Sequence, residues 1–241
     1  MFMRKFIIGL LALPCMAIAQ EKNVVSVNRV FPKQDKTQAF EKALAAHAQK
    51  YHKGDFSWRV YTIESGPDAG GYHITEGPMS WDGLDKREDL GTVHLNDWNT
   101  TITPLLTDRG SQSYSTYRAD LSSVALTEFS NKIAITHVFP KPGYQAEMEE
   151  ALMNFKKAWD TSGQTVAVYE SSSSGEPQWA IVTRYKQGLK ERETGFRAPM
   201  KERYEKANGE GSWARYQQSL RTMIDHSWSE LLFYKADLSS K

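Results

Sequence analysis

The sequence predicts an α+β fold in which two tandem repeats, each with the element order β-α-β-β-α-β, close into one eight-stranded antiparallel barrel with helices outside. The first observation is a duplication. Residues 25–61 align without a gap on residues 133–169, and the run Val-Phe-Pro-Lys at 30–33 recurs at 138–141. The second is that both copies close alike, with YRADLSS at 117–123 and YKADLSS at 234–240. A repeat of this length is too long for a solenoid unit, so each copy is expected to be a small domain.

The third observation is strand-like alternation at the start of each copy. Aliphatic residues occupy one face and small or polar residues the other: Val25 and Val27 against Ser26 and Asn28, then Ile133 and Ile135 against Ala134 and Thr136. A period of two residues is typical of a strand. We expect the aliphatic face to pack under the helices, which leaves Asn28 and Thr136 facing the barrel interior.

A helix follows each first strand, because apolar residues recur there at helical spacing. The stripe contains Phe40, Leu44 and His47 in the first copy, and Met148, Leu152 and Phe155 in the second. Since His47 takes the position of Phe155, we interpret it as a core or boundary histidine rather than a ligand. His52 lies near the end of this helix beside Lys53 and Gly54, and it is expected to be exposed.

The remaining elements complete the repeat. Two strands come next, at 56–63 and 71–76 in the first copy and at 165–171 and 178–183 in the second, with turn-rich loops between them. A mostly helical stretch follows, with Asp97 and Ser212 as expected N-caps, and a final strand closes each copy. We place the first ferredoxin-like repeat at 20–123, a linker at 124–130 and the second repeat at 131–241.

The first 19 residues are typical of a signal peptide. Arg4 and Lys5 form a basic start, a short apolar stretch follows, and Ala17-Ile18-Ala19 is a small-x-small cleavage site. This predicts export, to a periplasm, of a chain that starts at Gln20. A lipoprotein attached at Cys15 is the disfavoured alternative, because Pro14 directly before the cysteine fits a lipobox poorly.

Composition excludes several classes of function. A chain cut after Ala19 has no cysteine, which excludes disulfides and thiolate metal sites. Removal of Arg4 and Lys5 leaves 28 basic residues against 29 acidic ones, a net charge of −1. We therefore expect no nucleic-acid partner, and no segment after the signal is apolar enough to predict stable membrane insertion.

At the level of element order and duplication, the chain resembles the dimeric α/β-barrel superfamily. That group includes antibiotic-biosynthesis monooxygenases, stress-responsive A/B-barrel proteins, NIPSNAP-type proteins and chlorite-dismutase-like haem proteins. The resemblance rests on no catalytic motif. Single-repeat relatives dimerise to close the barrel, so for this chain a monomer is sufficient, and a homo-oligomer remains open.

Strand alternation also predicts a polar and aromatic barrel interior that could bind a small organic molecule. The ligand-binding candidates are Asn28, Arg59, Tyr61, His73, Thr136 and Tyr169. Arg59 would bind an anion. His73, Tyr61 and Tyr169 are the catalytic candidates, as a proton carrier and as donors to a developing oxyanion. The alternative is that these groups only hydrogen-bond one another across the seam between the halves.

The sequence leaves open whether the protein is an enzyme. One hypothesis is a ligand-binding barrel, with cofactor-free monooxygenase-like or isomerase-like chemistry as an extension. Another is a non-catalytic periplasmic scaffold, which predicts a filled barrel and an exposed apolar patch near Trp98 or Trp213. A third, implied by the chlorite-dismutase-like relatives, is haem binding. No metal site is predicted, because the histidines form no known ligand motif, and no cofactor is predicted, with haem left open.

Overall fold

A computed structural model describes residues 21–87 and 90–241 of the chain. The expected signal peptide, its cleavage site and Cys15 lie outside the described residues. Within the described ranges, no helix combines the length and apolar character needed to cross a lipid bilayer.

The order of strands and helices in each half is the predicted one. The first half contains β1 (Val24–Pro32), α1 (Thr37–Tyr51), β2 (Trp58–Ile63), β3 (Tyr72–Met79), α2 (Trp81–Asp85), α3 (Thr92–Asp97) and β4 (Leu106–Tyr117). The second half contains β5 (Lys132–Pro140), α4 (Gln145–Ser162), β6 (Val166–Ser172), β7 (Trp179–Arg184), α5 (Met200–Asn208), α6 (Ser212–Met223) and β8 (Ile224–Tyr234).

The eight strands form one closed antiparallel barrel in the order β1-β3-β2-β8-β5-β7-β6-β4. Two of its joins link the halves: β2 pairs with β8 through Tyr61 and Tyr234, and β4 pairs with β6 through Tyr117 and Tyr169. Closure removes the free sheet edges that each half would otherwise expose. The predicted fold class is confirmed.

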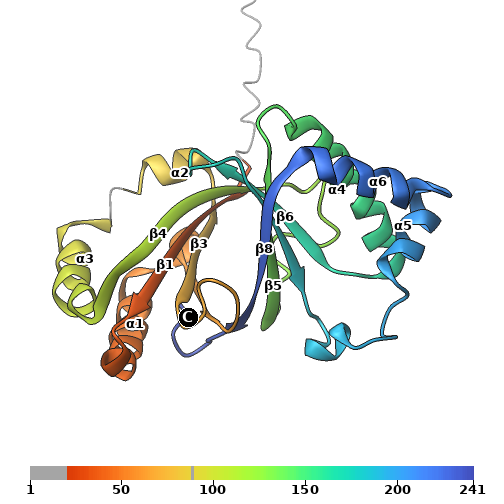
Figure 1. Cartoon of the computed structure of the whole chain (residues 1–241). Coiled ribbons are helices and arrows are strands. Elements are labelled where there is room, and N and C mark those ends of the chain that lie inside the picture. Colours follow the sequence, from red (N-terminus) through yellow and green to blue (C-terminus); the bar gives the residue numbers. More distant parts are fainter. Residues whose placement is uncertain (1–20, 88–89) are drawn as a thin grey trace, which may run out of the picture.

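The helices lie outside the barrel in two separate layers, one over each half (Figure 1). Under α1, Phe40 and Leu44 are fully buried against Val60 and Ile74 of the sheet. Under α4, Met148 and Leu152 form the matching core. Inside the barrel lies a third apolar cluster that draws on both halves and includes Ile63, Ile135 and Leu232.

The predicted orientation of the first strands is wrong. Val25, Val27, Ile133 and Ile135 line the barrel interior. Asn28 and Thr136 face outward instead: Asn28 lies near Glu76 and Arg87, and Thr136 lies near residues of α4. Alternation identifies which residues share a face, but both faces of a barrel strand are covered here, so aliphatic character does not decide which face points inward.

Two expectations about the helical layer of the first half also fail. His52 is fully buried rather than exposed. Asp97 is the last residue of α3 and not its N-cap, and its carboxylate receives a contact from His47 instead. In the second half, Ser212 is the first residue of α6, and Gly211 takes the N-cap position.

Candidate functional site

The barrel encloses a cavity of about 310 Å³ between the two halves. One part of its wall is aliphatic and comes largely from the second half, with Ile133, Ile135, Ala180 and Val182. Polar side chains of β1, β2 and β3 also line the cavity: Arg29, Arg59, Tyr61, His73 and Thr75. An apolar wall with a few placed polar groups is typical of a small-molecule site, and the volume lies at the lower end of that class.

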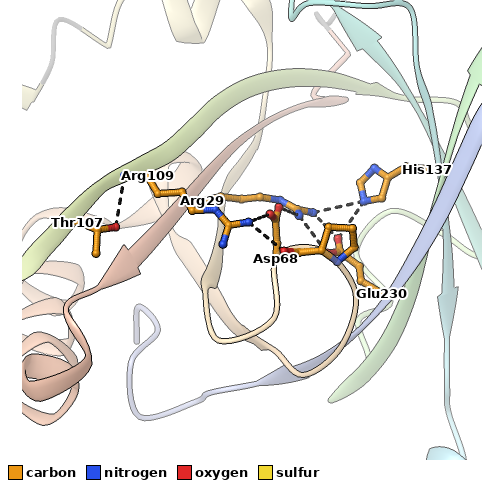
Figure 2. A network of polar contacts seen from close by, with 7 residues as sticks. Arg29, Asp68, Thr107, Arg109, His137 and Glu230 are labelled. Carbon is orange, nitrogen blue, oxygen red and sulfur yellow. Dashed lines mark hydrogen bonds and ion pairs between the residues drawn. The ribbon is translucent and has the colours of Figure 1, made fainter.

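A charged network lies beside the cavity and contributes Arg29, Asp68 and His137 to its wall. Figure 2 shows its contacts. Arg29 of β1 donates to Glu230 of β8 through both terminal nitrogens, and its Nη1 also lies 2.6 Å from an oxygen of Asp68. Arg109 of β4 contacts the other Asp68 oxygen at 2.5 Å, and His137 Nε2 lies 2.9 Å from Glu230 Oε1. Two guanidinium groups thus face two carboxylates, so Arg29 is already neutralised within the protein.

The loop between β2 and β3 delivers Asp68 to this network. Gly66 in that loop has φ near +92°, and a Cβ atom there would lie 2.9 Å from the Ser229 carbonyl oxygen. Only glycine allows both this conformation and such a close approach to β8. The Ser65 hydroxyl accepts the Leu231 N–H at 3.0 Å and fixes the loop to β8.

Arg59 differs from Arg29 because no carboxylate of the described residues forms an ion pair with it. Its guanidinium carbon lies 3.7 Å from the ring centroid of Phe129 and 4.6 Å from that of Tyr234. Its Nε is buried, and no described atom accepts a hydrogen bond from it. A half-buried guanidinium that is held by aromatic rings and lines a cavity is a ready site for a carboxylate or similar anion.

His73 and Tyr61 lie beside Arg59 with unused hydrogen-bonding capacity. The two residues are direct cross-strand partners, with ring centroids 6.3 Å apart. His73 Nδ1 is buried without a partner among the described residues. Burial, followed by the nearby charges of Arg29 and His137, lowers the pKa of His73 well below its usual value. The imidazole therefore stays neutral and offers a ligand one donor and one acceptor.

Tyr169 also lines the cavity, but its hydroxyl already has a partner. Arg184 Nη2 donates to it at 2.9 Å, while Arg184 Nη1 donates to the carbonyls of Ala125 and Glu128. Burial raises the pKa of Tyr169, although Arg184 opposes the shift. Tyr169 is thus a neutral phenol that Arg184 fixes in place.

Four of the six predicted ligand-binding residues therefore lie together in the cavity: Arg59, Tyr61, His73 and Tyr169. Asp68, Trp228, Glu230 and Arg184 also line or support the cavity, and sequence patterns did not identify them. One signal was available, since His137 aligns with Arg29 and both contact Glu230 in the structure.

Haem does not fit the barrel interior. A haem site needs an axial ligand atom from a side chain such as histidine, cysteine, methionine or tyrosine, together with room for the macrocycle. His137 Nε2 is held by Glu230, and the His137 ring stacks on Trp228 with centroids 3.9 Å apart. The cavity of about 310 Å³ suits a much smaller molecule.

Comparison with known proteins defines the fold. No family model and no curated protein matches the chain. Among solved structures, an anthrone oxidase-like protein matches with a TM-score of 0.59 and 15% identity, over 89% of this chain and 92% of the other. A proposed monooxygenase from Fusobacterium nucleatum matches with a TM-score of 0.55 and 13% identity, over 88% and 91%.

A chlorite dismutase variant from Candidatus Nitrospira defluvii matches with a TM-score of 0.52 and 8% identity, over 89% of this chain and 92% of the other. These likenesses cover most of both chains but involve few identical residues. The chain therefore has the dimeric α/β-barrel fold of the monooxygenase-like and chlorite-dismutase-like proteins, with both halves in one polypeptide. Fold alone does not give the reaction.

Proposed function

We propose that this protein is an exported binding protein for a small organic anion, which it holds inside the barrel. The observation that carries the proposal is Arg59, a cavity-lining cation without a carboxylate partner among the described residues. The anionic group of the ligand would meet this guanidinium. The apolar body would lie against Ile135 and Val182 of the opposite wall.

Binding is favoured over acid–base catalysis by the shifted pKa values of His73 and Tyr169, two of the three catalytic candidates. A general base works best with a pKa near the operating pH. The pKa of His73 is shifted far down and that of Tyr169 is shifted up, so neither group exchanges protons readily near neutral pH. Tyr61 and His73 then act as hydrogen-bonding groups that orient the ligand.

Cofactor-free oxygenase-like or isomerase-like chemistry is the second candidate. Its support is the pairing of the unpartnered His73 ring with Tyr61 beside an anion site. A bound anion would favour the protonated form of His73 and move its pKa upward, toward a useful range. Turnover of a retained ligand, lost in His73→Ala but not in the exposed control His226→Ala, would support this second candidate.

The scaffold hypothesis receives less support from the structure. It predicts a filled barrel, whereas the barrel contains a cavity. Trp98 and Trp213 are half-buried in the helical layers. Among the described residues, the large exposed hydrophobic side chains are Trp81, Val93, Leu95 and Met153.

Native mass spectrometry of protein purified from its own host tests the proposal, because a retained ligand would appear as added mass. Calorimetry with benzoate and with neutral benzamide then tests the role of charge. Arg59→Ala introduces the residue that the second copy has at this position, Ala167. Loss of a charge-assisted hydrogen bond should weaken benzoate binding by roughly 10- to 100-fold.

Arg221→Ala, which removes an exposed arginine at the end of α6, is the matched control and should leave binding unchanged. Equal binding of benzoate by wild type and Arg59→Ala, with no retained anion in native protein, would contradict the proposal. N-terminal sequencing of the purified protein tests export, with Gln20 expected as the first residue.

A further inference from the structure

Three buried histidines meet outside the barrel, in the helical layer of the first half. His47 lies on α1, His52 directly follows α1, and His94 lies on α3, with exposed fractions of 1%, 0% and 8%. Their ring centroids lie 4.8 to 5.3 Å apart in all three pairs. One ring nitrogen from each residue lies within 4.8 Å of the other two.

Two carboxylates set the orientation of two of these rings, those of His47 and His52. His47 Nδ1 lies 2.7 Å from Asp97 Oδ2, and His52 Nδ1 lies 2.9 Å from Glu76 Oε2. A carboxylate can only accept here, so each Nδ1 carries the proton and each Nε2 keeps its lone pair. A carboxylate on the far nitrogen is the usual support of a metal-binding histidine.

Glu76 is itself firmly held as an anion. It accepts from Trp58 Nε1 at 2.8 Å and from Arg87 Nε at 2.7 Å, in addition to His52. Burial works against its charge, but the hydrogen bonds from His52 and Arg87 outweigh it and lower the pKa of Glu76.

The spacing of one pair of these ring nitrogens already fits a tetrahedral ion, and one nitrogen of each of the three rings lies within 4.8 Å of the others. Zinc–nitrogen bonds of about 2.0–2.1 Å with tetrahedral angles place two ligand nitrogens about 3.3 Å apart. His52 Nε2 and His94 Nε2 are 3.2 Å apart. His47 Nε2 is fully buried and has no hydrogen-bond partner among the described residues. A buried lone pair without a partner is costly and requires an explanation.

From this arrangement we propose that His47, His52 and His94 bind a Zn²⁺ ion, with Asp97 and Glu76 as the supporting outer carboxylates. Three neutral imidazoles are a ligand set that zinc prefers, and they leave a fourth position for water or another ligand. The ion would fasten α3 to α1 and to the segment that follows α1. It would also give His47 Nε2 the partner that the described residues do not supply.

A purely structural role for the three rings explains less. A hydrogen bond between His52 and His94 would account for their 3.2 Å separation, but it leaves His47 Nε2 without a partner. The second half fills the same position with Phe155, so the fold does not need a histidine there. Local sequence spacing does not reveal this histidine cluster, because His47 and His94 are distant in the chain. The three rings come together only in the folded helical layer.

Zinc binding tests the proposal, using untagged protein purified from its own host. Elemental analysis is expected to find about one zinc per chain. After removal of metal with EDTA, titration with ZnCl₂ should be saturable at one site and should raise the melting temperature. Co²⁺ in its place should show the visible absorption of a tetrahedral ion with nitrogen ligands.

Two ligand variants and one matched control complete the experiment. His47→Phe installs the residue of the second half, and His94→Gln keeps a polar side chain. Both should lower zinc affinity by roughly 100-fold or more, and Asp97→Asn should lower it by roughly 10- to 100-fold. His226→Gln removes an exposed histidine on β8 and should not change it.

Circular dichroism in EDTA establishes that each variant is folded before its affinity is read. No saturable zinc binding by the wild type would overturn the proposal. Equal affinity of the wild type, His47→Phe and His94→Gln would overturn it too, because the zinc would then bind elsewhere.

Discussion

The two helical layers occupy equivalent places in the two halves but are built from different chemistry. In the first half, the space beside α1 holds histidines and carboxylates, among them His47 and Asp97. In the second half, Phe155 of α4 packs against the rings of Tyr204 and Tyr216, with centroids 5.0 and 4.8 Å away. The shared backbone therefore accommodates either aromatic or ionisable side chains between the helices and the sheet. Positions where the two copies differ in this way are candidate functional sites.

The largest expected effect concerns Glu230, whose position in the first half holds no acidic residue. The matching residue there is Ser113, so Glu230→Ser makes the two halves alike. The change leaves the buried Arg29 without its main carboxylate and frees His137 as well. We expect a loss of about 3 to 5 kcal/mol in the free energy of unfolding, measured by urea denaturation.

Glu193→Ser, at an exposed position, should cost less than about 0.5 kcal/mol. A similar small cost for Glu230→Ser would show that the network does not hold the two halves together.

Leu44 and Leu152 provide a matched pair for testing the common part of the layers. They align in the two copies, and both are fully buried under their helices. Leu44→Ala and Leu152→Ala should each cost about 2 to 5 kcal/mol. Urea denaturation of both variants in EDTA checks this, and nearly equal losses are expected. A difference of more than about 2 kcal/mol would mean that the different fillings change even the shared core.

His73 makes the free energy of unfolding depend on pH. The second half has no titratable group at this position, because the counterpart of His73 is Ala180. The unfolded histidine titrates near pH 6.5, while burial holds the folded one neutral to much lower pH. Below pH 6.5 the unfolded chain therefore binds more protons, and stability falls as the pH falls. His73→Ala should flatten this slope by at most about 1.4 kcal/mol per pH unit.

Urea denaturation between pH 7 and the acid range, at constant ionic strength, measures the slope. His226→Ala, at an exposed position, serves as the control. An unchanged slope in His73→Ala would show that His73 already charges normally in the folded protein.

The smallest effect is expected on the solvent side of α4. Lys156 forms an ion pair with Asp160 one turn later, with side-chain exposed fractions of 28% and 46%. Lys156→Gln should lower stability by no more than about 0.5 kcal/mol, and high salt should remove the difference from wild type. A loss above about 1 kcal/mol, measured by thermal denaturation, would mean that this surface contributes more than its exposure suggests.

The sequence predicted the fold through its duplication, and it predicted much of the cavity through strand alternation. Arg59, Tyr61, His73 and Tyr169 lie where that pattern placed them. Asn28 does not, because both faces of its strand are covered and the pattern cannot choose between them.

Other parts of the site depend on contacts between distant segments. Glu230 reaches Arg29 across 201 positions of sequence, and Asp68 arrives on a loop that Gly66 fits against β8. The environment of His52, which follows α1, likewise depends on Trp58 of β2 and Glu76 of β3. Such groups of residues come together through strand register and loop packing, so the local spacing of residues in the sequence does not predict them.

The covalent joining of the halves frees the barrel from two-fold symmetry. A barrel made of two identical chains must present each interior residue twice, so a group placed on one wall recurs on the other. Here Arg59 faces the chamber once, because its counterpart is Ala167. The asymmetry would let the proposed ligand, with an anionic group at one end and an apolar body at the other, bind in a single orientation.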